Sequence, residues 1–203
     1  MAKIRLTKSE SKKQKRELKR YTQYLPTLQL KKQQLQMEVS RIQNGLEQAK
    51  AKVLEYSGKL EKWVDVFGEE EAIRSIVRFR GVETEKENIA GIDIPVYKEI
   101  SFDTEKYDYI RTPLWVDAGV EAVKEMVTLR VKVEILEEQV RLLREELRTT
   151  TQRVNLFEKV KIPETKENIR KISIFLGDLQ TAEVVTGKIA KEKIQRKEAL
   201  ASA

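Results

Sequence analysis

Apolar side chains recur at intervals of three and four residues over two long stretches of this chain, and this repeat limits its fold more than any other feature. The first seam of apolar positions runs from Leu18 to Phe67, and only Lys32 interrupts it. A spacing that averages 3.5 residues is typical of a left-handed coiled coil, because a line on a straight helix drifts by about 20° per heptad. The seam predicts one long helix over residues 8–67, with a distortion at Pro26, which lacks a backbone donor.

The second seam follows the same spacing and covers most of the C-terminal half. Its first part comprises Gly119, Ala122, Met126, Leu129, Val133, Leu136, Val140, Leu143, Leu147, Thr150, Val154 and Phe157. The repeat then slips by one residue and resumes at Ile162, Thr165, Ile169, Ile172, Leu176 and Leu179. The pattern predicts a helix over about 116–200. Because Pro163 lies at the slip, we expect a kink or local unwinding there.

Each seam needs a partner, and the two seams of one chain can bury each other most economically as an antiparallel pair. We therefore expect a mainly α fold, a long antiparallel two-helix coiled coil, with Leu46 and Leu143 in its core. The coiled-coil segments are residues 1–67 and 116–203. The second helix is the longer one, so its C-terminal end is expected to project as a single helix.

Residues 68–115 differ in character and are predicted to form a small central β-hairpin insert. Residues 77–80 and 92–96 alternate apolar and polar side chains, which indicates two short strands joined through residues 83–88. Pro95 confines its strand to an edge or a strand end. A lone pair of strands is marginally stable, so we expect it to lie on the coiled coil.

Positive charge gathers at both ends of the chain, whose net charge is +7. Residues 1–20 contain nine Lys and Arg against two Glu, and residues 188–203 contain five against two. An antiparallel hairpin places both segments toward one end, which predicts a basic tip. Such a run is commonly a solvated helix face. It could also contact the phosphates of a nucleic acid or dock in a protein cavity with acidic walls.

Apolar residues in the distal part of the second helix favour the protein cavity. Leu176, Leu179, Val185 and Ile189 would stay wet against a phosphate surface, whereas a hydrophobic sleeve could cover them. A DNA-reading basic helix would also be expected in a dimer that forks at its zipper. We therefore predict no nucleic-acid partner.

The chain lacks the side chains and motifs of most catalytic sites. It has no His and no Cys, which excludes imidazole bases, thiolate nucleophiles and most zinc sites. The sequence Gly187-Lys188-Ile189 does not complete a phosphate loop, since Ala182 stands where the first glycine belongs. We expect a non-catalytic protein without cofactor or metal. No signal peptide or membrane span is recognisable, so a cytoplasmic location is expected.

Several motifs together resemble one known family. They are Thr7-Lys8, the heptads from Leu18, the segment 88–95 of sequence Asn-Ile-Ala-Gly-Ile-Asp-Ile-Pro, and the segment 153–158 of sequence Arg-Val-Asn-Leu-Phe-Glu followed by Ile162-Pro163. In order and spacing, these motifs are similar to the D subunits of V-type and A-type rotary ATPases over nearly the whole chain.

The resemblance implies a central-stalk rotor shaft whose termini enter a catalytic hexamer of A-type and B-type subunits. It also implies that the small F subunit binds the side of the shaft, and that a connecting stalk subunit links it to the membrane rotor. Arg153 and Asn155 then become candidate partner contacts, beside the four apolar residues of the distal helix. The chain would transmit torque between ATP hydrolysis or synthesis and proton or sodium transport, peripheral to the membrane and without spanning it.

Two other interpretations of the sequence remain open. One is a basic coiled-coil protein that binds nucleic acid, and the other is a structural coiled-coil spacer. Co-purification with nucleotide-hydrolysing subunits would separate the shaft from both.

Overall fold

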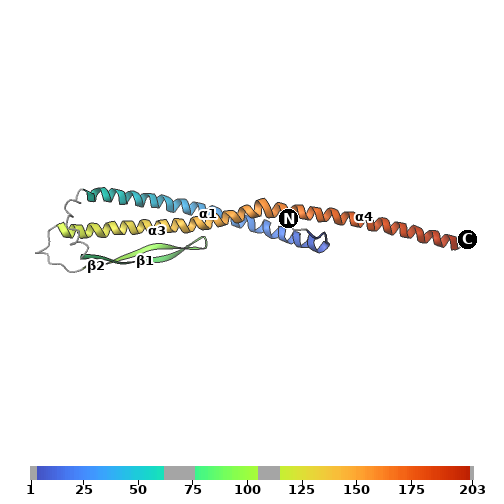
Figure 1. Ribbon diagram of the computed structural model, residues 1–203, viewed down its shortest axis with the longest axis horizontal. Helices are drawn as coiled ribbons and strands as arrows, with labels where there is room; N and C mark the ends of the chain where they lie inside the picture. Colours follow the sequence, from blue (N-terminus) through green and yellow to red (C-terminus); the bar gives the residue numbers. More distant parts are fainter. Residues whose placement is uncertain (1–3, 62–75, 105–114, 202–203) are drawn as a thin grey trace. The chain divides into compact units, whose positions relative to one another are not determined.

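The computed structural model is mainly α-helical, with two long helices and a small antiparallel sheet, as predicted (Figure 1). It describes residues 4–61, 76–104 and 115–201, with side chains to residue 197. The elements are α1 (Lys8–Glu61), β1 (Val77–Ile89), β2 (Ile92–Thr104), α3 (Trp115–Asn155), the π-helix η2 (Leu156–Lys161) and α4 (Ile162–Ala201). The predicted helical residues 62–67 and the outer parts of the insert lie outside the described residues.

The chain divides into two compact units, which are described separately. The hairpin unit comprises residues 31–150, and the terminal unit comprises residues 1–30 together with residues 151–203.

In the hairpin unit, α1 and α3 run antiparallel. Lys31 Nζ lies 2.8 Å from Glu146 Oε1, and further along α1, Lys50 Nζ lies 2.6 Å from Glu137 Oε1. Residue numbers thus rise along α1 while they fall along α3. Seam residues fill the contact between the helices, and Leu35 and Leu143 are fully buried. Leu143 therefore lies in the core as predicted, whereas Leu46 is only partly buried at its margin.

The insert is a single two-stranded ribbon, and its strands are longer than predicted. β1 pairs antiparallel with β2, with Val77 opposite Thr104 and Ile89 opposite Ile92. The chain reverses at Ala90 and Gly91, whose φ angles of 53° and 82° suit a tight hairpin turn. The predicted link through residues 83–88 is therefore wrong, because these residues belong to β1 and pair with β2. Pro95 is tolerated since both strands of a two-stranded sheet are edges.

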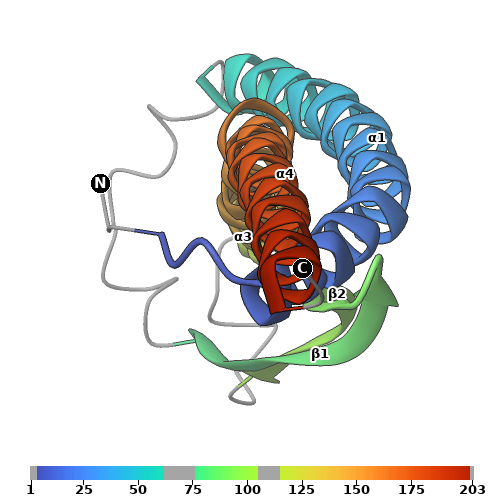
Figure 2. The ribbon, with the colours of Figure 1, turned by 90° about the vertical axis from the view of Figure 1, so that its right-hand side faces the viewer.

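The turn end of this ribbon packs on the helix pair. Ile94 of β2 is 2% exposed and belongs to the same apolar cluster as Leu35 and Leu143. The Gln139 side chain of α3, itself buried, donates a hydrogen bond from Nε2 to the carbonyl of Pro95. At the other end of the ribbon, Ile76 forms a second cluster with the start of α3. In the view along the helices, the ribbon forms a second layer beside them, and the expectation that it lies on the coiled coil is confirmed (Figure 2).

In the terminal unit, α1 begins at a side-chain cap and the second helix changes its pitch. The backbone N–H of Glu10 donates to Oγ1 of Thr7 at 3.2 Å, which satisfies one of the free donors of the first turn. α1 continues through the exposed Pro26 without a change of helix type. The distortion expected near Pro163 occurs as η2, which ends two residues before that proline.

Candidate functional site: the distal segment of α4

Residues 173–197 of α4 expose nearly all their side chains. Ile172, the last seam residue before them, is fully buried. Beyond it Leu176 is partly buried, and every other side chain from 173 to 197 is exposed. We call residues 173–197 the distal segment. Within the terminal unit, the distal segment is thus a helix with no packed face. It is the part of the chain that the sequence predicts to project as a single helix.

The distal segment nevertheless carries large apolar side chains. Of the predicted contact residues, Leu179, Val185 and Ile189 are 42%, 49% and 48% exposed. Four further exposed apolar residues were missed by the sequence analysis: Ile174, Phe175, Val184 and Ile194. Ile174 and Phe175 lie between the seam positions Ile172 and Leu176, and Val184 and Ile194 lie beyond Leu179, where the seam ends. Exposed apolar side chains gathered on one element are typical of a surface that binds a protein.

Positive charge accompanies these apolar side chains. Five exposed cations lie in the last part of the described segment: Lys188, Lys191, Lys193, Arg196 and Lys197. The first two turns of α1, in the same unit, add further exposed cations such as Lys12 and Lys13. The arrangement suits a partner surface that is apolar where it meets the helix and acidic around it.

Arg153 and Asn155 form a separate surface. Both are exposed in the last turn of α3, on either side of the buried Val154. At a rise of 1.5 Å per residue, about 31 Å of helix separates Asn155 from Leu176. The structure therefore does not bring together the two groups of predicted contact residues.

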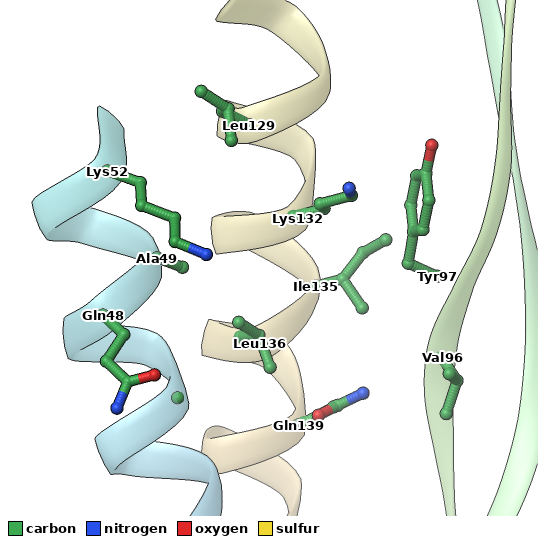
Figure 3. A pocket seen from close by; sticks show the side chains of 11 residues that line it. Gln48, Ala49, Lys52, Val96, Tyr97, Leu129, Lys132, Ile135, Leu136 and Gln139 are labelled. Carbon is green, nitrogen blue, oxygen red and sulfur yellow. The ribbon is translucent and has the colours of Figure 1, made fainter. Parts of the chain in front are cut away.

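The hairpin unit has a groove that the sequence analysis did not find (Figure 3). Its volume is about 320 Å³, and it is lined by α1, α3 and β2. Gly45 and Ala49, one turn apart on α1, leave room for the groove because their side chains are small. This pair of small residues is the feature of the sequence that could have indicated the groove. Lys52 and Lys132 contribute its cations. The ammonium group of Lys132 lies 4.9 Å from the centre of the Tyr97 ring, within cation–π range.

Two other features, a cluster of metal ligands and a membrane-spanning helix, are absent from the described residues. Within the ranges that the structure describes, no three His, Cys, Asp or Glu side chains are arranged to hold a metal ion. In the same ranges, none of the helices has an apolar stretch long enough to cross a membrane.

Comparison with known proteins agrees with the resemblance that the motifs indicate. The family model described as the D subunit of ATP synthase matches residues 10–192. The V-type ATP synthase D subunit of Borreliella burgdorferi is 46% identical over 197 residues, which cover 97% of this chain and 98% of that protein. The V-type ATP synthase D subunits of Chlamydia caviae and Chlamydia pneumoniae are 39% and 36% identical, over 96% and 97% of this chain and 95% of each relative. The chain therefore belongs to the family of V-type ATP synthase D subunits.

Proposed function

We propose that this chain is the non-catalytic central rotor shaft of a V-type or A-type ATPase. As a member of the D-subunit family it belongs to a multi-subunit complex. In the proposed role it transmits torque between ATP hydrolysis or synthesis in a catalytic hexamer and proton or sodium transport through a membrane rotor. The proposed location is cytoplasmic and peripheral to the membrane.

The observation that carries the proposal is the exposed apolar surface of the distal segment. Removing apolar surface from water contributes about 25 cal/mol per Å². A helix that ends in exposed residues such as Leu179, Val185 and Ile189 therefore has a reason to enter a sleeve formed by other subunits. The cations beyond Thr186 would meet acidic groups at the sleeve wall.

Torque transfer in this scheme requires packing and differential contact, and no bond is made or broken on the shaft. The antiparallel pairing of α1 and α3, with Leu35 and Leu143 fully buried between them, resists sliding of one helix along the other. A surface without rotational symmetry touches each member of a surrounding ring differently. Its orientation can therefore favour different conformations in successive members of the ring.

Two further partners follow from the family resemblance and are part of the proposal. The small F subunit is proposed to bind the side of the shaft. Arg153 and Asn155 are candidate partner contacts because both are exposed. A connecting stalk subunit is proposed to join the insert end to the membrane rotor.

Truncation after residue 180 tests the role of the distal segment. The buried side chains of the terminal unit end at Ile172, so the truncated chain should keep its helical signal and its binding of the F subunit. Coupling of ATP hydrolysis to rotation in the reassembled complex should weaken. Full coupling under load would contradict the proposal, as would binding of duplex DNA by the intact chain at sub-micromolar affinity in physiological salt.

A substitution pair separates the apolar contribution from the basic one. Val185→Ser with Ile189→Ser removes apolar surface and keeps every cation of the distal segment. We expect this double variant to weaken the coupling of ATP hydrolysis to rotation in the reassembled complex. The matched control is Leu54→Ser, which changes a 77% exposed leucine of α1 in the hairpin unit and should leave coupling unchanged.

A further inference from the structure

The π-helix η2 coincides with the single slip in the second apolar repeat. Up to Phe157 the seam advances by three and four residues in turn, so the next seam position would be residue 161. The repeat instead resumes at Ile162. The sequence thus contains one residue more than a continuous heptad pattern allows, and the structure has its only described π-helix over Leu156–Lys161.

The hydrogen bonds show how the extra residue is accommodated. The backbone N–H of Ile162 donates to the carbonyl of Phe157, five residues back, where an α-helix would use the carbonyl four residues back. One widened turn therefore takes up one residue. Just beyond it, Oγ1 of Thr165 donates to the carbonyl of Lys161 at 2.6 Å, so a side chain supports the junction with α4.

Packing on both sides of η2 shows that the seam is preserved across it. Before the slip, Val154 is 3% exposed and the Phe157 ring stacks on Tyr21, with the ring centroids 5.3 Å apart. After the slip, Thr165 is 4% exposed and Ile172 is fully buried. Within η2 itself, Phe157 is partly buried, whereas Leu156 and Val160 remain 45% and 48% exposed, so apart from Phe157 the widened turn contributes little apolar burial.

We infer that η2 is a register-correcting insertion that makes a soft joint in the second helix, and that the fold does not need it. Its i+5 hydrogen bonds and exposed apolar residues should let it open more readily than the α-helix on either side, since local opening is easiest where few apolar contacts hold a segment. π-turns of this kind frequently occur at functional sites. The inference concerns the chain alone and does not depend on the proposed function.

Deletion of Lys159 tests the inference in the full-length chain. Lys159 is exposed in the middle of η2, and without it the step from Phe157 to the next seam residue becomes four. We expect continuous α-helix, an unchanged or higher melting temperature, and amide hydrogen exchange at residues 158–165 slower by about tenfold or more. Mass-spectrometric hydrogen exchange and thermal melts followed by far-UV circular dichroism measure these quantities.

Deletion of Arg148 is the matched control, since it also removes one exposed cation from the same helix. The deletion shortens the step between the seam residues Leu147 and Thr150 from three residues to two. Even if η2 then relaxes to α-helix, Thr150, Val154 and Phe157 stay rotated by about 100° from their packed positions. We expect this variant to melt at least about 5 °C lower than the unaltered chain.

Two results would overturn the inference. The first is a melting temperature of the Lys159 deletion as low as that of the Arg148 deletion, which would mean that the fold requires the extra residue. The second is unchanged amide exchange at residues 158–165 after deletion of Lys159, which would mean that η2 is not a soft joint.

Discussion

Leu143→Ala should be among the most destabilising single substitutions in the hairpin unit. Leu143 is fully buried, in one cluster with Leu35 of α1 and Ile94 of β2. The change removes three carbon atoms, worth about 2.4 kcal/mol at about 0.8 kcal/mol per buried methylene. A cavity left between two helices and a strand adds to this cost, so we expect the free energy of unfolding to fall by about 3–5 kcal/mol.

Urea denaturation followed by far-UV circular dichroism measures this loss. Leu54→Ala is the matched control, because the same atoms are removed from a side chain that is 77% exposed, and it should change the free energy of unfolding by less than about 0.5 kcal/mol. Ile94→Ala should also be costly, and its effect should not add to that of Leu143→Ala because the two residues share a cluster. Equal stability of the Leu143→Ala and Leu54→Ala variants would refute the pairing of α1 with α3 described above.

Three further predictions concern the insert and its surroundings. Replacing residues 77–97 by a short Gly/Ser linker should keep the far-UV helical signal but lower the free energy of unfolding, because Ile94 leaves the core. It should also weaken the coupling of the chain to its partners, and loss of the helical signal would contradict the prediction. Gly91→Ala should destabilise the fold by about 1 kcal/mol, because the φ angle of Gly91 is 82°. Gly58→Ala, in open space on α1, should stabilise the fold by a similar amount. Thermal melts measure both changes, and the opposite ranking would disprove the turn geometry. Burial raises the pKa of Tyr56 to about 12, and a hydrogen bond to Glu125 adds to the shift. The stability that the neutral phenol contributes is therefore present below about pH 10 and is lost as the pH rises toward 12. Tyr56→Phe should remove that part of the alkaline loss, which unfolding measured at pH 9 to 12 against the unaltered chain would detect.

The helices could be predicted from the sequence because their signal is long and periodic. The described start of α1 at Lys8 and the start of α3 at Trp115 lie within one residue of the predicted positions. The full burial of Leu143 follows from the same repeat. The partial exposure of Leu46 does not, since it depends on how the helices and the ribbon pack around it, and a local pattern does not encode that packing.

The extent of the ribbon could not be predicted, because six of its residues look like a loop. Glu83 to Asn88 are charged or polar and have weak strand preference. They are paired because the turn at Ala90 and Gly91 fixes the register and because Ile94 anchors the opposite strand in the helix core.

The slip near Pro163 was visible in the sequence, but a slip can be spread over many residues or absorbed in one turn. Only the backbone hydrogen bond from Ile162 to Phe157 shows that one turn absorbs it.

The buried Ile94 also has a consequence for the order of folding. The β1–β2 ribbon pairs residues at most 27 positions apart, whereas Lys31 and Glu146 are separated by 115 positions. Closing the shorter loops costs less chain entropy, so the ribbon can form before the two helices meet. A ribbon that is already closed presents Ile94 as a ready-made contact for whichever helix arrives first. The insert would thus act as a template during folding, and substitutions at Ile94 should slow refolding, whereas substitutions in the distal segment should leave the refolding rate unchanged.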